Sequence, residues 1–91
     1  MSTTEIYPAD LPASPPGRTL RRLLAAEGLS QAELARRMGR PYQIVNDIVH
    51  GRRPITPTTA LQLERVLELP ARFWMIREAD YRLKLARASA A

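Results

Sequence analysis

Apolar residues recur at a helical spacing in five successive stretches of the chain, and each stretch is bounded by residues that start or stop helices. With these boundary residues included, the pattern predicts helices over residues 17–27, 30–39, 41–51, 56–68 and 71–87. Alternating patterns typical of strands are nearly absent. The sequence therefore predicts an all-α fold of five helices.

Residues suited to helix ends support these boundaries. Gly28 follows the first helix, where glycine is common just past a C-terminus. Ser30 begins the second helix with a capping box, because Glu33 can return a hydrogen bond to the Ser30 amide. Pro41 suits the first turn of the third helix, where its missing N–H costs nothing. Thr56 and the proline after it suit the start of the fourth.

The first sixteen residues differ from the rest, since they hold four prolines and no apolar periodicity. We expect a flexible Pro-rich tail over residues 1–16 and one helix-turn-helix domain over residues 17–91. The chain has 91 residues, which is one domain with a small core. That size leaves no room for a nucleotide-binding α/β enzyme with a sizeable substrate pocket.

Composition excludes several kinds of site. The chain has no cysteine and one histidine, His50, which excludes disulfides, thiolate or multi-histidine metal sites and a cysteine nucleophile. No two residues have the spacing of a nucleophile and its base, so we expect no enzyme, no cofactor and no small-molecule substrate. The chain also lacks an apolar run of the roughly 18 residues that a membrane span needs, and a signal-peptide pattern. These features predict a cytoplasmic protein with no membrane partner.

Positive charge is concentrated in the middle of the chain. The net charge is +5, to which residues 1–17 contribute −2, residues 18–53 contribute +5 and residues 54–91 contribute +2. A basic region on a small domain suits a polyanion such as DNA, because phosphate contacts release counterions. A solvated arginine-rich surface is the alternative explanation.

Residues 30–39 and 42–51 have the spacing of a helix-turn-helix unit, whose second helix enters the major groove of DNA. Ala35 is small where the two helices approach closely, and Gly39 lies where the turn needs a positive φ. A helical pair that binds no DNA could share this packing pattern.

Residues 16–75 resemble the Cro/repressor (XRE) helix-turn-helix class, and more closely the HigA-type antitoxins of toxin–antitoxin modules. The segments that carry the resemblance are Pro16-Gly17, residues 29–35 (LSQAELA), residues 51–56 (GRRPIT), residues 59–63 (TALQL) and Phe73-Trp74. The resemblance implies a lambda-repressor-like domain. It also implies a dimeric antitoxin that binds double-stranded operator DNA, represses its own operon and neutralises a HigB/RelE-like ribonuclease toxin. A stand-alone XRE-type repressor and a helical adaptor that binds only protein are the alternatives.

By this resemblance, the DNA-facing residues lie on the third helix. Gln43 and Asn46 are expected to contact bases, since both side chains can pair bidentately with adenine. Tyr42 is expected to contact a thymine methyl group or a phosphate. Asp47 could accept from cytosine, or it could instead form a salt bridge with an arginine, Arg40 or Arg52.

Other residues are expected to contact the DNA backbone. Gln31 matches a phosphate-binding position at the start of the second helix. Four arginines are expected to contact phosphates by charge and position, namely Arg36, Arg40, Arg52 and Arg53.

The last helix carries two apolar stripes, one of which is sufficient to close a core. One stripe is formed by Phe73, Ile76, Ala79, Leu83 and Ala86, and the other by Trp74, Tyr81, Leu85 and Ala88. The second stripe indicates a homodimer whose interface includes Trp74, Tyr81 and Leu85. Alternatively, Trp74 and Tyr81 pack against the first helix of their own chain.

Overall fold

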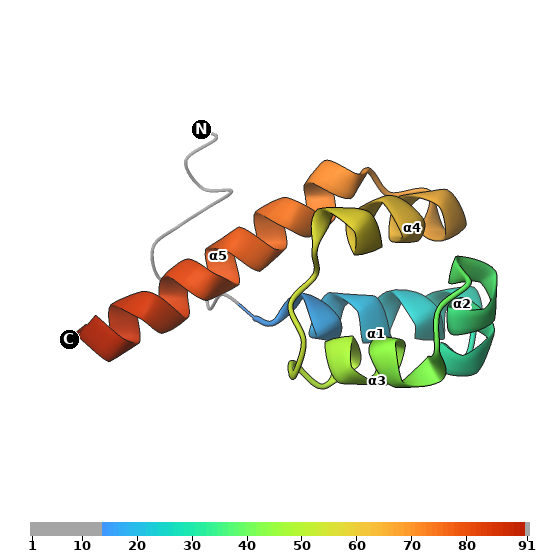
Figure 1. The fold of residues 1–91 in the computed structure, drawn as a ribbon, viewed down its shortest axis with the longest axis horizontal. Coiled ribbons are helices and arrows are strands. Elements are labelled where there is room, and N and C mark those ends of the chain that lie inside the picture. Colours follow the sequence, from blue (N-terminus) through green and yellow to red (C-terminus); the bar gives the residue numbers. More distant parts are fainter. Residues whose placement is uncertain (1–13, 91) are drawn as a thin grey trace.

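Five α-helices follow one another in the computed structural model, which describes residues 14–90 (Figure 1). Their bounds are α1 Pro16–Glu27, α2 Gln31–Met38, α3 Tyr42–Val49, α4 Pro57–Leu67 and α5 Ala71–Ala90. The described residues contain no strand, so the predicted all-α fold is confirmed. No helix within residues 14–90 is both long enough and apolar enough to cross a membrane.

Helix boundaries differ from the predicted ones by a few residues. Pro16 is buried as the first residue of α1, whereas the predicted tail over residues 1–16 includes it. Most of that predicted tail, residues 1–13, lies outside the described residues. Pro41 precedes α3 at the N-cap instead of lying in its first turn. The last helix extends to Ala90, three residues beyond the predicted end.

Local hydrogen bonds explain where the short helices begin and end. The Ser30 hydroxyl accepts a hydrogen bond from the Glu33 N–H (3.0 Å), and the Thr56 hydroxyl accepts from the Thr59 N–H (3.3 Å). Gly39 ends α2 with a φ of 72°, in the left-handed region that favours glycine. The predicted return bond from the Glu33 carboxylate is replaced by ion pairs with Arg36 and Arg37.

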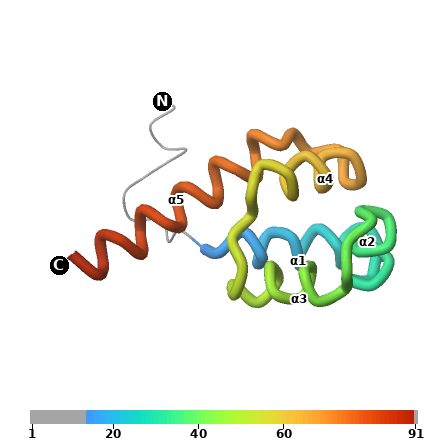
Figure 2. Tube along the Cα trace, in the orientation of Figure 1, coloured from blue at the N-terminus to red at the C-terminus, as the bar shows by residue number. Residues whose placement is uncertain are grey.

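The helices enclose one hydrophobic core. Figure 2 shows α4 and the start of α5 on one side of the molecule and α1 with α3 on the other. Helix α2 contacts both α3 and α4, and α1 contacts both α3 and α5. The buried apolar side chains come from all five helices and the α3–α4 connector, and they are Leu20, Leu24, Leu34, Ala35, Met38, Val45, Ile48, Val49, Ile55, Ala60, Leu63 and Trp74.

Helix α5 divides into a covered half and an exposed half. Trp74 has no exposed surface and belongs to the core, so the expectation that it lies in a dimer interface is wrong. The alternative, packing within its own chain, holds for this residue. The stripe that begins at Phe73 does not close the core either, because Ile76 is 40% exposed and Leu83 is 50% exposed. Every residue from Arg82 to Ala90 is exposed, and this end of α5 projects past the other helices (Figure 1).

Candidate nucleic-acid interface

Helices α2 and α3 form the predicted turn-linked pair. Val45 is completely buried and Ile48 is 2% exposed, so the apolar face of α3 packs into the core. Ala35, 3% exposed, lies on the buried face of α2. Gly39 supplies the left-handed residue of the turn. The opposite face of α3 is left to polar side chains.

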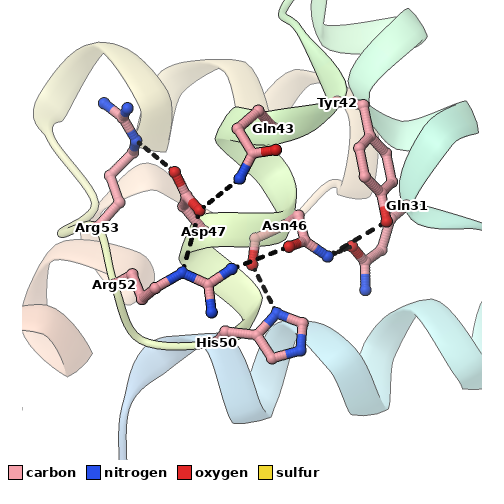
Figure 3. A network of polar contacts seen from close by, with 8 residues as sticks. All are labelled: Gln31, Tyr42, Gln43, Asn46, Asp47, His50, Arg52 and Arg53. Carbon is pink, nitrogen blue, oxygen red and sulfur yellow. Dashed lines mark hydrogen bonds and ion pairs between the residues drawn. The ribbon is translucent and has the colours of Figure 1, made fainter.

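A continuous network of polar contacts covers this face (Figure 3). It joins residues from three segments: Gln31 at the start of α2, the α3 side chains, and His50 and two arginines of the connector between α3 and α4. The members are Gln31, Tyr42, Gln43, Asn46, Asp47, His50, Arg52 and Arg53. All four predicted base-contacting residues and three of the five predicted phosphate-contacting residues are therefore brought together.

Asn46 makes contacts with all three segments. Its side-chain amide donates to the Gln31 Oε1 atom (3.0 Å) and to the Tyr42 hydroxyl (3.2 Å). Its Oδ1 atom accepts from Arg52 Nη2 (3.0 Å). An asparagine amide has two hydrogens, so both are engaged within the protein. Asn46 therefore fixes the positions of its neighbours relative to one another.

Gln43 and Asp47, one helical turn apart, form a second part of the network, which Arg52 joins to Asn46. The Gln43 Nε2 atom donates to Asp47 Oδ1 (2.8 Å), which also accepts from Arg52 Nε (3.2 Å). Arg53 Nε lies 4.0 Å from Asp47 Oδ2. The hydrogen bond from Gln43 holds the pKa of Asp47 below its ordinary value, and the hydrogen bond from Arg52 and the charges of Arg52 and Arg53 add to this effect. The carboxylate thus neutralises part of the arginine charge; of the two arginines considered as its partner, Arg52 pairs with it.

Two predicted phosphate-contacting residues lie in other contacts. Arg36 forms a two-pronged pair with Glu33, with Arg36 Nε 3.0 Å from Glu33 Oε1. Together with Arg37, it lowers the pKa of Glu33 to about 2. Arg40 donates to Gln62 Oε1 (2.8 Å) and so ties the α2–α3 turn to α4. Neither side chain takes part in the network on α3.

Two residues gain contacts that the sequence reasoning missed. His50 Nδ1 lies 2.9 Å from the Asn46 carbonyl oxygen, which brings the histidine to the edge of the network. Its spacing of four residues from Asn46 was the available signal. Glu78 of α5 is 6% exposed and accepts a hydrogen bond from the connector. Its signal was a charge within the apolar stripe that begins at Trp74.

Comparisons with known proteins agree with this geometry. A family model described as helix-turn-helix matches residues 20–74. Virulence-associated protein I of Dichelobacter nodosus is 37% identical over 78 residues, which are 85% of this chain and 72% of that protein.

Two solved structures are similar over most of their length. Pseudomonas aeruginosa antitoxin HigA with the higBA promoter is 35% identical, with a TM-score of 0.82 and 86% of each chain covered. An addiction module antidote protein of the HigA family from Coxiella burnetii is 28% identical, with a TM-score of 0.81 and 88% of each chain covered.

The fold and the polar face of α3 define a helix-turn-helix DNA-binding protein. The sequence match and the solved structures narrow this class. The chain belongs to the XRE-type helix-turn-helix family, in the branch of the HigA-type antitoxins. The resemblance inferred from residues 16–75 is thereby confirmed.

Proposed function

We propose that this protein acts in the cytoplasm as a homodimeric antitoxin that binds the operator of its own toxin–antitoxin operon and represses it. In the same proposal, it neutralises a HigB/RelE-like ribonuclease toxin. The observation that carries the DNA-binding part is the polar face of α3, on which two amide side chains are flanked by arginines. The similar HigA of Pseudomonas aeruginosa, solved with promoter DNA, supports it.

Gln43 is the better placed of the two amides for contacting a base. Asp47 occupies one of its two amide hydrogens. The other hydrogen and the Oε1 atom remain for the bidentate pair that glutamine makes with adenine N7 and N6. Asp47 therefore orients Gln43 for reading a base, and its own carboxylate faces arginines instead of phosphates.

The flanking residues suit the DNA backbone. Arg52 and Arg53 are both exposed, and they lie three and four residues past the end of α3. Gln31 lies at the N-terminus of α2, where unpaired amides and the helix dipole favour a phosphate. Contacts of this kind supply affinity and orientation, while the amides on α3 supply sequence preference.

Binding to a duplex from upstream of the protein's own coding region tests the DNA-binding part. Gln43→Ala is expected to lower affinity for this duplex roughly tenfold while leaving binding to unrelated DNA unchanged, because a bidentate contact discriminates by about 1–3 kcal/mol. Asn46→Ala is expected to lower the affinity for the upstream duplex and for unrelated DNA, since Asn46 also positions Gln31 and Arg52. Titrations by fluorescence anisotropy at several salt concentrations measure these effects.

A phosphate contact predicts a different result. Arg53→Ala should weaken binding to all duplexes alike and reduce the slope of log affinity against log salt by about one. Arg65→Ala, an equal change of charge on α4, is the matched control. Unchanged sequence preference in Gln43→Ala, or equal salt slopes for the two arginine variants, would contradict the proposed interface.

Co-expression tests the antitoxin part. The product of the neighbouring reading frame, if it encodes a RelE-like fold, is expected to co-purify with this protein and to lose ribonuclease activity in the complex. Failure to bind any product of a neighbouring gene, together with intact operator binding, would favour a stand-alone repressor.

A further inference from the structure

The connector between α3 and α4, residues 50–56, carries Arg52 and Arg53 and has no helix to hold its shape. Backbone N–H groups hold it at its α3 end, where those of His50, Gly51 and Arg52 donate to α3 carbonyl oxygens, and again at Ile55. The Arg52 N–H donates to the Asp47 carbonyl oxygen (2.8 Å), and the Ile55 N–H donates to Glu78 Oε1 of α5 (3.0 Å). The intervening Pro54 has no N–H to contribute. Asp47 and Asn46 hold Arg52 from the α3 side, and the bond at Ile55 holds the connector on the far side of the two arginines.

Glu78 is the charged residue that the fold buries within residues 14–90. A carboxylate removed from water is unfavourable unless it is paired and hydrogen-bonded. One oxygen accepts from Ile55, and the other pairs with Arg82 on the next turn of α5 (2.5 Å). The Arg82 side chain is 44% exposed, so the pair connects a buried backbone group with the outer part of α5.

Packing alone does not explain why residue 78 is a glutamate. An apolar residue at this position of α5 would extend the stripe that contains Trp74 without the cost of desolvating a charge. It would, however, leave the Ile55 N–H buried and unpaired, since Ile55 itself is 2% exposed. The main structural effect of the Glu78 carboxylate is therefore to bind the connector at Ile55, and not to stabilise the core.

We infer that Glu78 is a positioning residue for DNA binding, which holds the connector so that Arg52 and Arg53 face the phosphate backbone. The inference deepens the proposed function, on which it rests for the role of the two arginines. Through the hydrogen bond between Glu78 and the Ile55 N–H, α5 thus affects the DNA-binding face of α3 by way of the connector.

Two substitutions separate the hydrogen bond from the charge. Glu78→Leu keeps most of the volume and removes both acceptor oxygens, while Glu78→Gln keeps an acceptor for Ile55 and loses the ion pair with Arg82. We expect Glu78→Leu to lower affinity for the upstream duplex about tenfold and to reduce the salt slope by about one to two, as loss of two phosphate contacts would. Glu78→Gln should remain within about twofold of the unsubstituted protein.

A control distinguishes positioning from general destabilisation. Leu67→Ala removes apolar contacts at the far end of α4 and is expected to lower Tm without changing the salt slope. All titrations are made at a temperature where circular dichroism reports full folding. A normal affinity and salt slope in folded Glu78→Leu would overturn the inference, and so would an equal change of slope in Leu67→Ala.

A double-mutant cycle tests whether Glu78→Leu lowers DNA affinity through Arg52 and Arg53. In a protein that already carries Arg52→Ala and Arg53→Ala, Glu78→Leu should cause no further loss of affinity, because the groups it positions are absent. A further tenfold loss in that background would overturn the inference. Normal DNA binding by the double arginine variant alone would instead contradict the proposed interface.

Hydrogen exchange supplies a measurement that needs neither DNA nor a destabilised variant. The Ile55 amide should exchange slowly in the unsubstituted protein and in Glu78→Gln, since both provide an acceptor. Exchange of Ile55 as fast as that of an unprotected amide in the unsubstituted protein would overturn the inference even if Glu78→Leu failed to fold.

Discussion

The two amides on the exposed face of α3 have different roles. Within residues 14–90, Gln43 has one side-chain partner, Asp47, and keeps a donor and an acceptor for a base. Asn46 is hydrogen-bonded to Gln31, Tyr42 and Arg52. A bidentate contact of Asn46 with adenine must give up one of its two donated bonds, because both amide hydrogens are engaged. Its contribution to sequence preference is therefore tied to rearrangement of its neighbours.

Gly17 is required by a close approach between two helices. A Cβ atom at this position would lie 2.0 Å from the Ile48 carbonyl oxygen and 2.6 Å from that of Val49. The first turn of α1 thus packs directly against the backbone at the end of α3. Because these neighbours are backbone atoms, they cannot turn aside as a flexible side chain would.

Gly17→Ala is accordingly expected to destabilise the protein by about 3 kcal/mol or to shift α1 away from α3. Gly28→Ala is the matched control, since a Cβ there meets open space and the cost, about 1–2 kcal/mol, comes from its φ of 66°. Urea unfolding of both variants measures the difference. A smaller loss in Gly17→Ala than in Gly28→Ala would refute the packing argument.

Helical spacing was sufficient to predict which residues share the exposed face of α3, because residues four apart lie on one side of a helix. This rule covers the pairs Tyr42–Asn46 and Gln43–Asp47. It could not predict the partners of Arg40, since its bond to Gln62 joins residues 22 apart in sequence. Charge alone indicates that an arginine is near a site, not which group it contacts.

At the scale of elements, α2 is stabilised by contacts among its own residues and its N-cap, Ser30. Ser30 caps its first turn, and Glu33 pairs with Arg36 and Arg37 one turn later. These exposed pairs hold the pKa of Glu33 at about 2, far below its ordinary value of 4.5. The free energy of folding therefore depends on pH through this residue.

The sign of that dependence follows from the lowered pKa. The ionised carboxylate contributes stability above about pH 4.5, and this contribution is lost as the pH falls toward 2. We expect Glu33→Gln to lower Tm slightly at neutral pH, with the difference from the unsubstituted protein shrinking below about pH 4.5 and at high salt. Glu27→Gln, at the end of α1, is the control for thermal scans across this range. A difference for Glu33→Gln that stays constant down to pH 2 would argue against the pairing.

The helices themselves were predictable because each has a local start or stop signal, such as Ser30, Gly39 or Thr56. The sequence did not predict which face of α5 is buried. Trp74 and Phe73 are adjacent and both apolar, so periodicity allowed either to face the core. Only the position of α5 against α1 and α4 decides between them, and that position is a property of the tertiary fold.

For the whole molecule, we propose that the exposed half of α5 is the interface of the proposed homodimer. Leu85 is 41% exposed and Tyr81 is half-buried, so both are accessible to a second copy, unlike the buried Trp74. Two copies joined there could present two α3 helices to successive major grooves, about 34 Å apart on DNA.

Leu85→Glu is expected to weaken such a dimer at least tenfold, because a charge would be buried in an apolar interface. Leu61→Glu introduces the same change on α4, at a side chain that is 59% exposed, and should leave the association unchanged. Sedimentation equilibrium measures both. A protein that is monomeric at all accessible concentrations, or one in which the two variants dissociate alike, would exclude this dimer.

The exposed end of α5 also bears on how fast a protease would degrade the chain. Residues 82–90 are exposed throughout, so this segment can unravel without opening the core that surrounds Trp74. It contains Arg82, Lys84 and Arg87, which are cleavage points for a trypsin-like protease. A partner seated on α5 would shield them. Fraying of the end of α5 would then set the half-life of the free chain against proteolysis. In the assembly, complete unfolding would set it.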